Sequence, residues 1–401
     1  IKSANIGPIT QDLVEQGASS VGNTLTNVKT LFGNLCDEKA VRTKQATQLL
    51  TLAWEKIHTG YWKNVAIVWR DLYAFSSVLV AVTELESNSP EKAMERLDMG
   101  LLMGGPHFEE LLKSAVSTIK ELLSRQAKKR KCSDNAETGE RKRSRLLPKV
   151  DKASFPNISP ANRISRVHPP SLEQFLTKYM ISSVPVIITN LINNWPCIQN
   201  KSWEDMTYLK QAAGMRTVPV EIGSKYTSSD WGQSLMTLSD FIDIHITHEK
   251  PNDKSGIGYV AQTSLFDQIP VLARDIREPD YVSLSQKDIL IKNAWFGPGG
   301  TVSPLHYDPY HNLLCQAVGY KYIRLYAPSE TPFVYPHGDK MLFNTSQVEV
   351  ERPDHDRFPK FKDAKCIECI LGPGDVLYMP PKWWHYIRSL SVSFSVSFWW
   401  E

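Results

Sequence analysis

The sequence is short of cysteine, of long apolar runs and of net charge, and each shortage excludes a class of protein. Six cysteines in 401 residues cannot make the disulfide framework of a small secreted domain, so we expect a reducing compartment. The longest apolar runs, such as Val78–Val82, are far too short to span a bilayer. A net charge of +3 does not by itself indicate nucleic-acid binding. No secretory signal is visible, although the sequence starts at Ile1 and any earlier targeting segment would be absent from it.

What the chain does contain is an ordinary globular composition, 42% hydrophobic, 22% charged and 10% aromatic. A chain of this length and composition can bury a sizeable core and is long enough for two or three domains. Changes of pattern along the sequence predict a helical domain at 1–124, a basic linker at 125–150 and a catalytic domain at 151–401.

Residues 49–122 show the periodicity of amphipathic helices. Apolar residues recur at helical spacing in four stripes, which are Leu49, Ala53 and Ile57; Val68, Leu72, Phe75 and Leu79; Ala93, Leu97 and Leu101; and Phe108, Leu111, Ala115, Ile119 and Leu122. Ser87–Pro90 separates two of these helices, and Gly104–Gly105 ends the next. The stripes predict antiparallel helix pairs, with a tetratricopeptide-like array as one option. We expect Trp54, Trp62 and Trp69 to pack in the core, with an interaction surface as the alternative.

Residues 125–150 change to a polar and strongly basic composition. Lys128–Lys131 and Arg141–Arg145 flank a polar spacer, and the segment has no apolar periodicity. Two dense basic clusters at this spacing resemble a bipartite nuclear-import signal. They predict that an import receptor binds residues 128–145 and that the protein is nuclear, with the cytoplasm as a second location. The alternative is a solvated tether that only keeps two domains apart.

From Asp151 onward, short β-rich runs alternate with Gly and Pro turns. The strand candidates are Pro185–Thr189, Thr217–Ile222, Gly258–Gln262, Asn312–Val318, Lys321–Tyr326, Val376–Pro380 and Ser391–Phe398. Many short strands with such turns predict a sandwich or a barrel, and a double-stranded β-helix (jelly roll) fits. The predicted fold class is therefore α+β, with an N-terminal all-α domain and a C-terminal jelly roll.

His306, Asp308 and His385 are the candidate metal ligands. His306 and Asp308 are two residues apart, and in an extended strand such residues point to the same face. The distant segment Pro380–Tyr386 supplies a second imidazole from another strand. Two histidines and one carboxylate form the facial triad typical of non-haem Fe(II) oxygenases, which leaves open coordination positions.

Lys321 is a candidate for binding an anion beside the metal. In a regular strand it shares a face with Ile323 and Leu325, so we expect its ammonium group to be partly buried. A buried charge needs an opposite charge, and no acid is evident close by in the sequence. A bound dicarboxylate would supply that charge. The alternative is a surface lysine on an edge strand.

Residues 160–401 resemble the JmjC-domain 2-oxoglutarate oxygenases. The resemblance rests on the motifs Ser303–Asp308, Asn312, Lys321–Tyr326, Trp384–Tyr386 and Ser397–Trp400. It implies a cupin-like jelly roll, a bound Fe(II), and 2-oxoglutarate and O2 as co-substrates. It also implies residue roles, with iron ligated by His306, Asp308 and His385 and 2-oxoglutarate bound by Tyr259, Ser303, Asn312, Lys321 and Trp399.

The same resemblance places a substrate pocket at Glu221, Trp231, Gln262 and Trp295. An acid with flanking indoles suits a guanidinium group through a charge-assisted hydrogen bond and cation–π contact. The expected activity is therefore hydroxylation of protein side chains, first of all arginine C–H, in nuclear, ribosomal or chromatin-linked proteins. Two alternatives remain open. Aromatic walls also suit a methylammonium, which would make the protein a histone methyl-lysine demethylase, and a catalytically idle binding module is the third reading.

Two local features depart from the resemblance. Tyr307, Tyr310 and His311 stand where glutamines are expected, and these bulkier neighbours predict an altered choice of substrate. The odd spacing of His311 from the first ligand predicts that its ring faces away from the metal. Regular alternation does not place Ser303 on the metal face, although Pro304 next to it would allow an irregularity.

Overall fold

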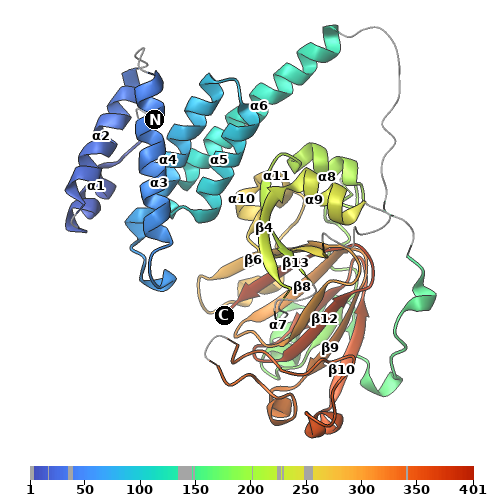
Figure 1. Ribbon diagram of the computed structural model, residues 1–401. Helices are drawn as coiled ribbons and strands as arrows, with labels where there is room; N and C mark the ends of the chain where they lie inside the picture. Colours follow the sequence, from blue (N-terminus) through green and yellow to red (C-terminus); the bar gives the residue numbers. More distant parts are fainter. Residues whose placement is uncertain are drawn as a thin grey trace. The chain divides into compact units, whose positions relative to one another are not determined.

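The periodic segments of the sequence fold into helices in the first third of the chain and into strands in the remainder (Figure 1). The computed structural model describes residues 4–401 except 17, 35–38, 134–146, 148–149, 201, 224–226, 228–229, 248–255 and 340–341. The chain divides into two units, the first made of residues 1–141 with 215–217 and the second of 142–214 with 218–401. Over the described residues, none of the helices combines the length and the apolar character needed to cross a membrane.

The first unit is built from helices that pack in sequence order around one apolar core. Its helices are α1 (Gly7–Glu15), α2 (Ser19–Asn34), α3 (Lys39–Ile57), α4 (Ile67–Glu86), α5 (Pro90–Met103) and α6 (Glu109–Ser133), with 3-10 turns η1 (Trp62–Asn64) and η2 (Pro106–Phe108). The predicted punctuation is confirmed, because α4 ends just before Ser87, α5 begins at Pro90, and Gly104 follows the last residue of α5. The stripes of α3 and α4 are buried as predicted.

Helices α1 and α2 and the start of α3 lie in residues 1–45, within the predicted helical domain but ahead of its first apolar stripe. Two details of the helical prediction were wrong. In the α6 stripe, Phe108 and Ile119 are buried as predicted, but Leu112 and Val116 are buried where Leu111 and Ala115 were expected, and Leu122 is 41% exposed. Trp69 is buried as predicted, but Trp54 is 39% exposed and its ring contacts the tilted ring of His58 instead of lying in the core. The side chain of Trp62 lies outside the described part of the structure.

Helix α6 extends to Ser133, so the backbone of the first basic cluster, Lys128–Lys131, is helical. The second cluster, Arg141–Arg145, lies outside the described residues. The import-signal interpretation of residues 128–145 therefore stays a prediction.

The second unit is a two-sheet structure. Its strands are β1 (Arg166–Val167), β2 (Val186–Ile188), β3 (Thr217–Ile222), β4 (Gly232–Thr237), β5 (Gly258–Thr263), β6 (Leu290–Gly297), β7 (Val302–His306), β8 (His311–Val318), β9 (Lys321–Tyr326), β10 (Cys366–Leu371), β11 (Val376–Met379), β12 (Trp384–Ser389) and β13 (Ser393–Trp400). Its helices are α7 (Leu172–Phe175), α8 (Met206–Ala213), α9 (Leu238–Phe241), α10 (Leu265–Gln268) and α11 (Pro270–Ala273), and Figure 1 shows α8 to α11 gathered together. Short 3-10 and π turns connect them, namely η3 (Lys152–Ser154), η4 (Pro160–Asn162), η5 (Leu176–Met180), η6 (Ile242–Ile246), η7 (Asp280–Leu284), η8 (Pro328–Phe333) and η9 (Pro359–Asp363).

The larger sheet has the strand order β1-β2-β11-β8-β13-β6-β5-β3-β4, and the smaller sheet has the order β10-β9-β12-β7. Neighbours such as β8 and β13, or β9 and β12, pair antiparallel across non-consecutive strands, as in a jelly roll. One apolar cluster of the second unit, which includes Leu314, Ile323 and Leu377, contains residues of both sheets. The jelly-roll prediction is therefore confirmed.

A tight turn between β8 and β9 places Lys321 at the start of its strand. Gly319 has a φ of +73°, and a Cβ atom there would lie 1.9 Å from the carbonyl oxygen of Val392. Only glycine adopts this backbone at such a close approach. The turn therefore fixes where β9 begins and which of its residues face inward.

Candidate metal centre

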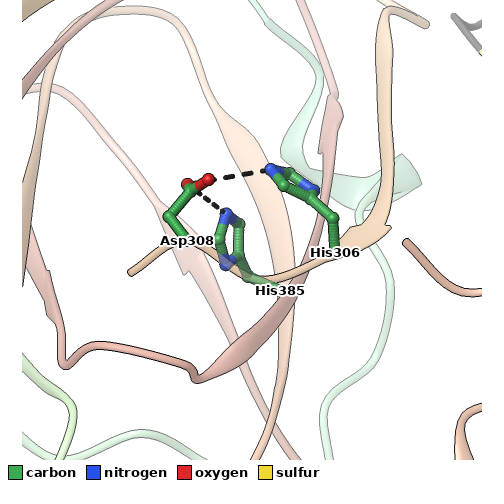
Figure 2. A group of neighbouring side chains, drawn as sticks. All are labelled: His306, Asp308 and His385. Carbon is green, nitrogen blue, oxygen red and sulfur yellow. Dashed lines mark ion pairs between the residues drawn. The ribbon is translucent and has the colours of Figure 1, made fainter. Parts of the chain in front are cut away.

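The three predicted metal ligands converge on one point (Figure 2). His306 ends β7 and lies directly opposite His385, the second residue of β12. Oδ2 of Asp308 is 3.9 Å from Nε2 of His306 and 3.5 Å from Nε2 of His385. All three donor atoms lie within 4.8 Å of one another, close enough to bind a single ion.

The backbone at Asp308 differs from the predicted strand. It lies two residues past the end of β7, in the loop before β8, and not in an extended strand. The amide of Lys382 donates a hydrogen bond of 2.8 Å to the carbonyl oxygen of Asp308 and so ties this loop to the segment before β12. The convergence was predicted correctly, while the strand argument for Asp308 was wrong.

Backbone carbonyls fix the tautomer of both imidazoles. Nδ1 of His306 lies 2.7 Å from the carbonyl oxygen of Pro304, and Nδ1 of His385 lies 3.0 Å from that of Trp383. A carbonyl can only accept a hydrogen bond, so Nδ1 carries the proton in each ring. Each Nε2 therefore carries the lone pair of its ring, and both Nε2 atoms point toward Asp308, as metal-ligating histidines require.

The surroundings of His306 and Asp308 favour the protonation states that metal binding needs. Desolvation, with the neighbouring His385 ring, lowers the pKa of His306 to about 4, so this imidazole is neutral at pH 7. Burial alone would raise the pKa of the Asp308 carboxyl, but the adjacent His385 and His306 rings keep this pKa below its ordinary value. Oδ2 of Asp308 is buried and has no hydrogen-bond partner among the described residues, which suits a carboxylate that takes a metal ion.

Lys321 is buried, at 1% exposure, in the cavity that holds the ligands. Its ammonium donates a hydrogen bond of 3.1 Å to the Tyr259 hydroxyl, and no ion pair of Lys321 occurs within the described part of the chain. Desolvation lowers its pKa to about 7. The prediction of a buried cation near the metal is confirmed, and the missing counter-charge is what a bound anion would supply.

A β-bulge brings Ser303 into the same cavity. His306 is opposite His385, while Ser303 is opposite Ile387, so three residues of β7 span two of β12. This irregularity beside Pro304 turns Ser303 onto the metal face, where its hydroxyl shares a hydrogen bond with Tyr259.

Asn312 and Trp399 complete the cavity from the larger sheet. They are cross-strand partners on β8 and β13, and both line the cavity. Oδ1 of Asn312 and Nε1 of Trp399 are buried, and neither has a hydrogen-bond partner in the described part of the chain. One unpaired acceptor and one unpaired donor beside a buried ammonium describe a site shaped for a polar molecule. Three apolar lining residues that the sequence analysis did not single out are Leu314, Met379 and Ile387.

Three of the four predicted substrate residues lie beside this cavity. Trp295 lines it, and its indole N–H donates a hydrogen bond of 2.9 Å to the buried Ser397 hydroxyl. Glu221 lies on β3 directly opposite Tyr259 on β5. Burial raises the pKa of Glu221, while a hydrogen bond with Trp231 partly counteracts this. Gln262 is exposed, has a φ of +45° and is absent from the cavity lining, so the structure does not bring it to the others.

Other candidate ligands stay outside the centre. Nδ1 of His311 lies 2.7 Å from the Tyr378 hydroxyl, and its ring stacks on Trp400, so it faces away from the metal as predicted. Among the described residues, only His306, Asp308 and His385 form a group able to hold a metal.

The two sheets and the two-histidine, one-carboxylate centre define a cupin-like protein with a metal site of the oxygenase type. Sequence comparison agrees with this class. A family profile described as "Cupin-like domain" matches residues 172–401, and one described as "KDM8-like, N-terminal ARM repeats" matches residues 30–135. Armadillo-type repeats therefore replace the tetratricopeptide option for the helical part.

Several relatives match nearly the whole chain. "Lysine-specific demethylase 8" of Danio rerio is 43% identical over 367 residues, which cover 90% of this chain and 88% of that protein. The protein of the same name from Xenopus tropicalis is 41% identical, with 88% and 87% covered. "Jumonji C domain-containing protein 5" of Drosophila melanogaster is 40% identical, with 87% and 84% covered. The chain therefore belongs to the JmjC family of lysine-specific demethylase 8, as the motif resemblance indicated.

Proposed function

We propose that this protein is an Fe(II)- and 2-oxoglutarate-dependent oxygenase that hydroxylates arginine side chains of protein substrates. The observation that carries the proposal is the buried Lys321 ammonium, without an acidic partner in the described chain, in one cavity with His306, Asp308 and His385. A redox-active metal ion accounts for the ligand set, and a dicarboxylate co-substrate accounts for the buried ammonium.

The residues of the cavity fit such a co-substrate. The ammonium of Lys321 and the hydroxyls of Tyr259 and Ser303 would hold its distal carboxylate. Asn312 and Trp399 offer the unpaired acceptor and donor nearer the metal. Nε2 of His306, Nε2 of His385 and the Asp308 carboxylate would hold Fe(II).

When bound, iron and 2-oxoglutarate supply the oxidising chemistry, in which 2-oxoglutarate and O2 become succinate and CO2 and a substrate C–H becomes C–OH. The protein's own part is to bind, orient and exclude water. Leu314, Met379 and Ile387 line the cavity with apolar surface and keep water from the reacting groups. The carbonyls of Pro304 and Trp383 keep both imidazoles in the ligating tautomer throughout.

Glu221 supports arginine as the target. Its partly buried carboxylate lies one strand from Tyr259 and is held by Trp231, so it can accept two hydrogen bonds from a planar guanidinium. Trp295, fixed by Ser397, adds an aromatic wall for cation–π contact.

The second candidate is demethylation of methyl-lysine in proteins such as a histone tail. The names of the relatives favour it. The same centre would hydroxylate an N-methyl group, and the product would lose formaldehyde. A carboxylate beside indoles can bind either a methylammonium or a guanidinium. The planar guanidinium forms more matched hydrogen bonds with the carboxylate than a methylammonium does. A catalytically idle module would not need the complete ligand set or the buried lysine.

Mass spectrometry of arginine and methyl-lysine peptides, incubated with enzyme, Fe(II) and 2-oxoglutarate, tests the proposal. Gain of one oxygen atom on arginine supports hydroxylation, and loss of a methyl group supports demethylation. If neither peptide changes and 2-oxoglutarate is not consumed, the proposed function is wrong.

The cellular setting is also a proposal. The basic clusters within residues 128–145 support binding by an import receptor and a nuclear location, which would bring chromatin-linked proteins within reach as substrates or partners. Fluorescence microscopy of the full chain and of a variant with Lys128–Lys131 changed to alanine tests this. An unchanged distribution would contradict it.

A further inference from the structure

The inference concerns Phe343, whose side chain is 57% exposed. A single exposed hydrophobic residue is ordinary on a protein surface, so exposure alone indicates nothing. The large exposed hydrophobic side chains of the described second unit are mostly aliphatic, and the aromatic ones among them are Trp231 and Phe343. Trp231 hydrogen-bonds with Glu221 beside the metal cavity. The position of Phe343 shows that it too belongs to this region.

The segment that carries Phe343 is fastened to the ligand-bearing segment of β7. The amide of Tyr307 donates to the carbonyl oxygen of Asn344 at 3.0 Å, and the Asn344 side-chain amide donates to the carbonyl oxygen of Tyr307 at 2.8 Å. The amide of Ser346 donates to the carbonyl oxygen of Leu305 at 2.7 Å. These bonds on both sides of His306 fix Phe343 relative to the metal ligands.

Phe343 packs against a row of two further aromatic side chains. Its ring meets the edge of Tyr307 with centroids 6.3 Å apart, and Tyr307 meets the edge of Trp384 at 4.9 Å. Trp384 is fully buried, and it precedes the ligand His385. Tyr307 stands between the ligands His306 and Asp308. Phe343 is therefore the exposed end of an aromatic row whose inner members are sequence neighbours of the ligands, and Trp384 lies on the opposite face of β12 from His385.

We propose that Phe343 forms a subsite for an apolar side chain of the polypeptide substrate, at a position flanking the oxidised residue. This inference rests on the proposed function, because it assumes that a polypeptide reaches the metal. A polypeptide whose target side chain enters the cavity must lay its neighbouring residues on the surface beside the ligands. A fixed, exposed aromatic ring there gains by covering its apolar area, and such residues dominate binding at protein interfaces.

The test uses the full chain and pairs of peptides that carry leucine or serine at each flanking position of the target. We expect the wild-type protein to favour the leucine peptide in kcat/KM by roughly tenfold at one position. Phe343→Ser should bring this ratio close to one, mainly by lowering kcat/KM for the leucine peptide. Phe343→Leu should keep most of the ratio. Ile181→Ser, which changes a residue that is 72% exposed in the same unit, should keep all of it.

Three results would overturn the inference. One is a wild-type protein without preference for leucine at any flanking position, and another is a preference that Phe343→Ser leaves intact. The third is a dimer that Phe343→Ser dissociates in sedimentation while the peptide ratio stays the same, since Phe343 would then contact a second copy of the chain. If no peptide is oxidised, the proposed function fails separately, and fluorescence anisotropy of the same peptides still measures whether Phe343→Ser removes the leucine preference in binding.

Discussion

Glu221 and Tyr259 lie directly opposite one another on the antiparallel strands β3 and β5. The Tyr259 hydroxyl accepts a hydrogen bond from Lys321, while the Glu221 carboxyl shares one with Trp231. One cross-strand pair therefore joins the group proposed to hold the substrate cation to the group proposed to hold the co-substrate anion. Binding of either should depend on β3 and β5 keeping this register.

Loss of the Lys321 charge should weaken 2-oxoglutarate binding. Lys321→Met keeps most of the side-chain volume and removes the ammonium, and we expect the KM for 2-oxoglutarate to rise by roughly 10- to 100-fold, as for loss of a buried charge-assisted hydrogen bond. Without ligand, the same variant should unfold at an equal or higher temperature, because an uncompensated buried cation costs stability. Lys292→Met, which removes a surface ion pair with Glu278, serves as the control. An unchanged KM would contradict the assignment of Lys321.

The lowered pKa of Lys321, about 7, predicts a pH dependence of co-substrate binding. Above pH 7 the amine of the free protein loses its proton, and a bound dianion would restore it. Affinity for 2-oxoglutarate should therefore fall as pH rises above 7, with net proton uptake on binding. Isothermal calorimetry in buffers of different ionisation enthalpy measures this uptake.

The stability of the ligand-free protein should change in the opposite direction and rise with pH. Above pH 7 the unfolded chain holds the proton that the folded chain has lost, so this group adds stability as pH rises.

Removal of a metal ligand should abolish turnover without unfolding the protein. His306→Ala should lose bound iron and product formation, since two remaining donors hold the ion poorly. The fold should survive because His306 ends its strand and the neighbouring pairs of β7 and β12 remain. Metal analysis and thermal unfolding of the variant measure both points. Ni(II) or Zn(II) in place of iron should bind to the wild-type ligands and stop turnover. Activity that survives in His306→Ala would refute the site.

Local patterns could predict those parts of the site that depend on residue type, and the pairing of distant strands decided the rest. The two histidines, the aspartate and Lys321 were predictable because ionisable residues at short spacing or within apolar runs stand out in the sequence. The loop position of Asp308 and the bulge that turns Ser303 inward were not, because both follow from the register between β7 and β12. In α6, packing against the neighbouring helices buries Leu112 and Val116 more fully than the predicted Leu111 and Ala115. No alternation rule places Gln262, whose left-handed backbone lies at an irregularity between β5 and β6.

Neutralising Glu221 should weaken binding of the cationic substrate and leave the co-substrate site intact. Glu221→Gln keeps the size and the hydrogen-bonding shape, so we expect kcat/KM for an arginine peptide to fall by roughly 10- to 100-fold with little change in the KM for 2-oxoglutarate.

Because burial raises the pKa of Glu221 above its ordinary 4.5, wild-type peptide binding should weaken with falling pH earlier than an ordinary glutamate would allow. The variant should lose this pH dependence. It should also be at least as stable as the wild type at pH 7, because the buried carboxylate costs stability above its folded pKa. Trp231→Phe removes the hydrogen bond that lowers this pKa, so it should shift the loss of peptide binding to higher pH. Peptide affinity measured across pH 4 to 8 separates these outcomes, and an identical profile for the wild type and Glu221→Gln would show that another acid holds the substrate.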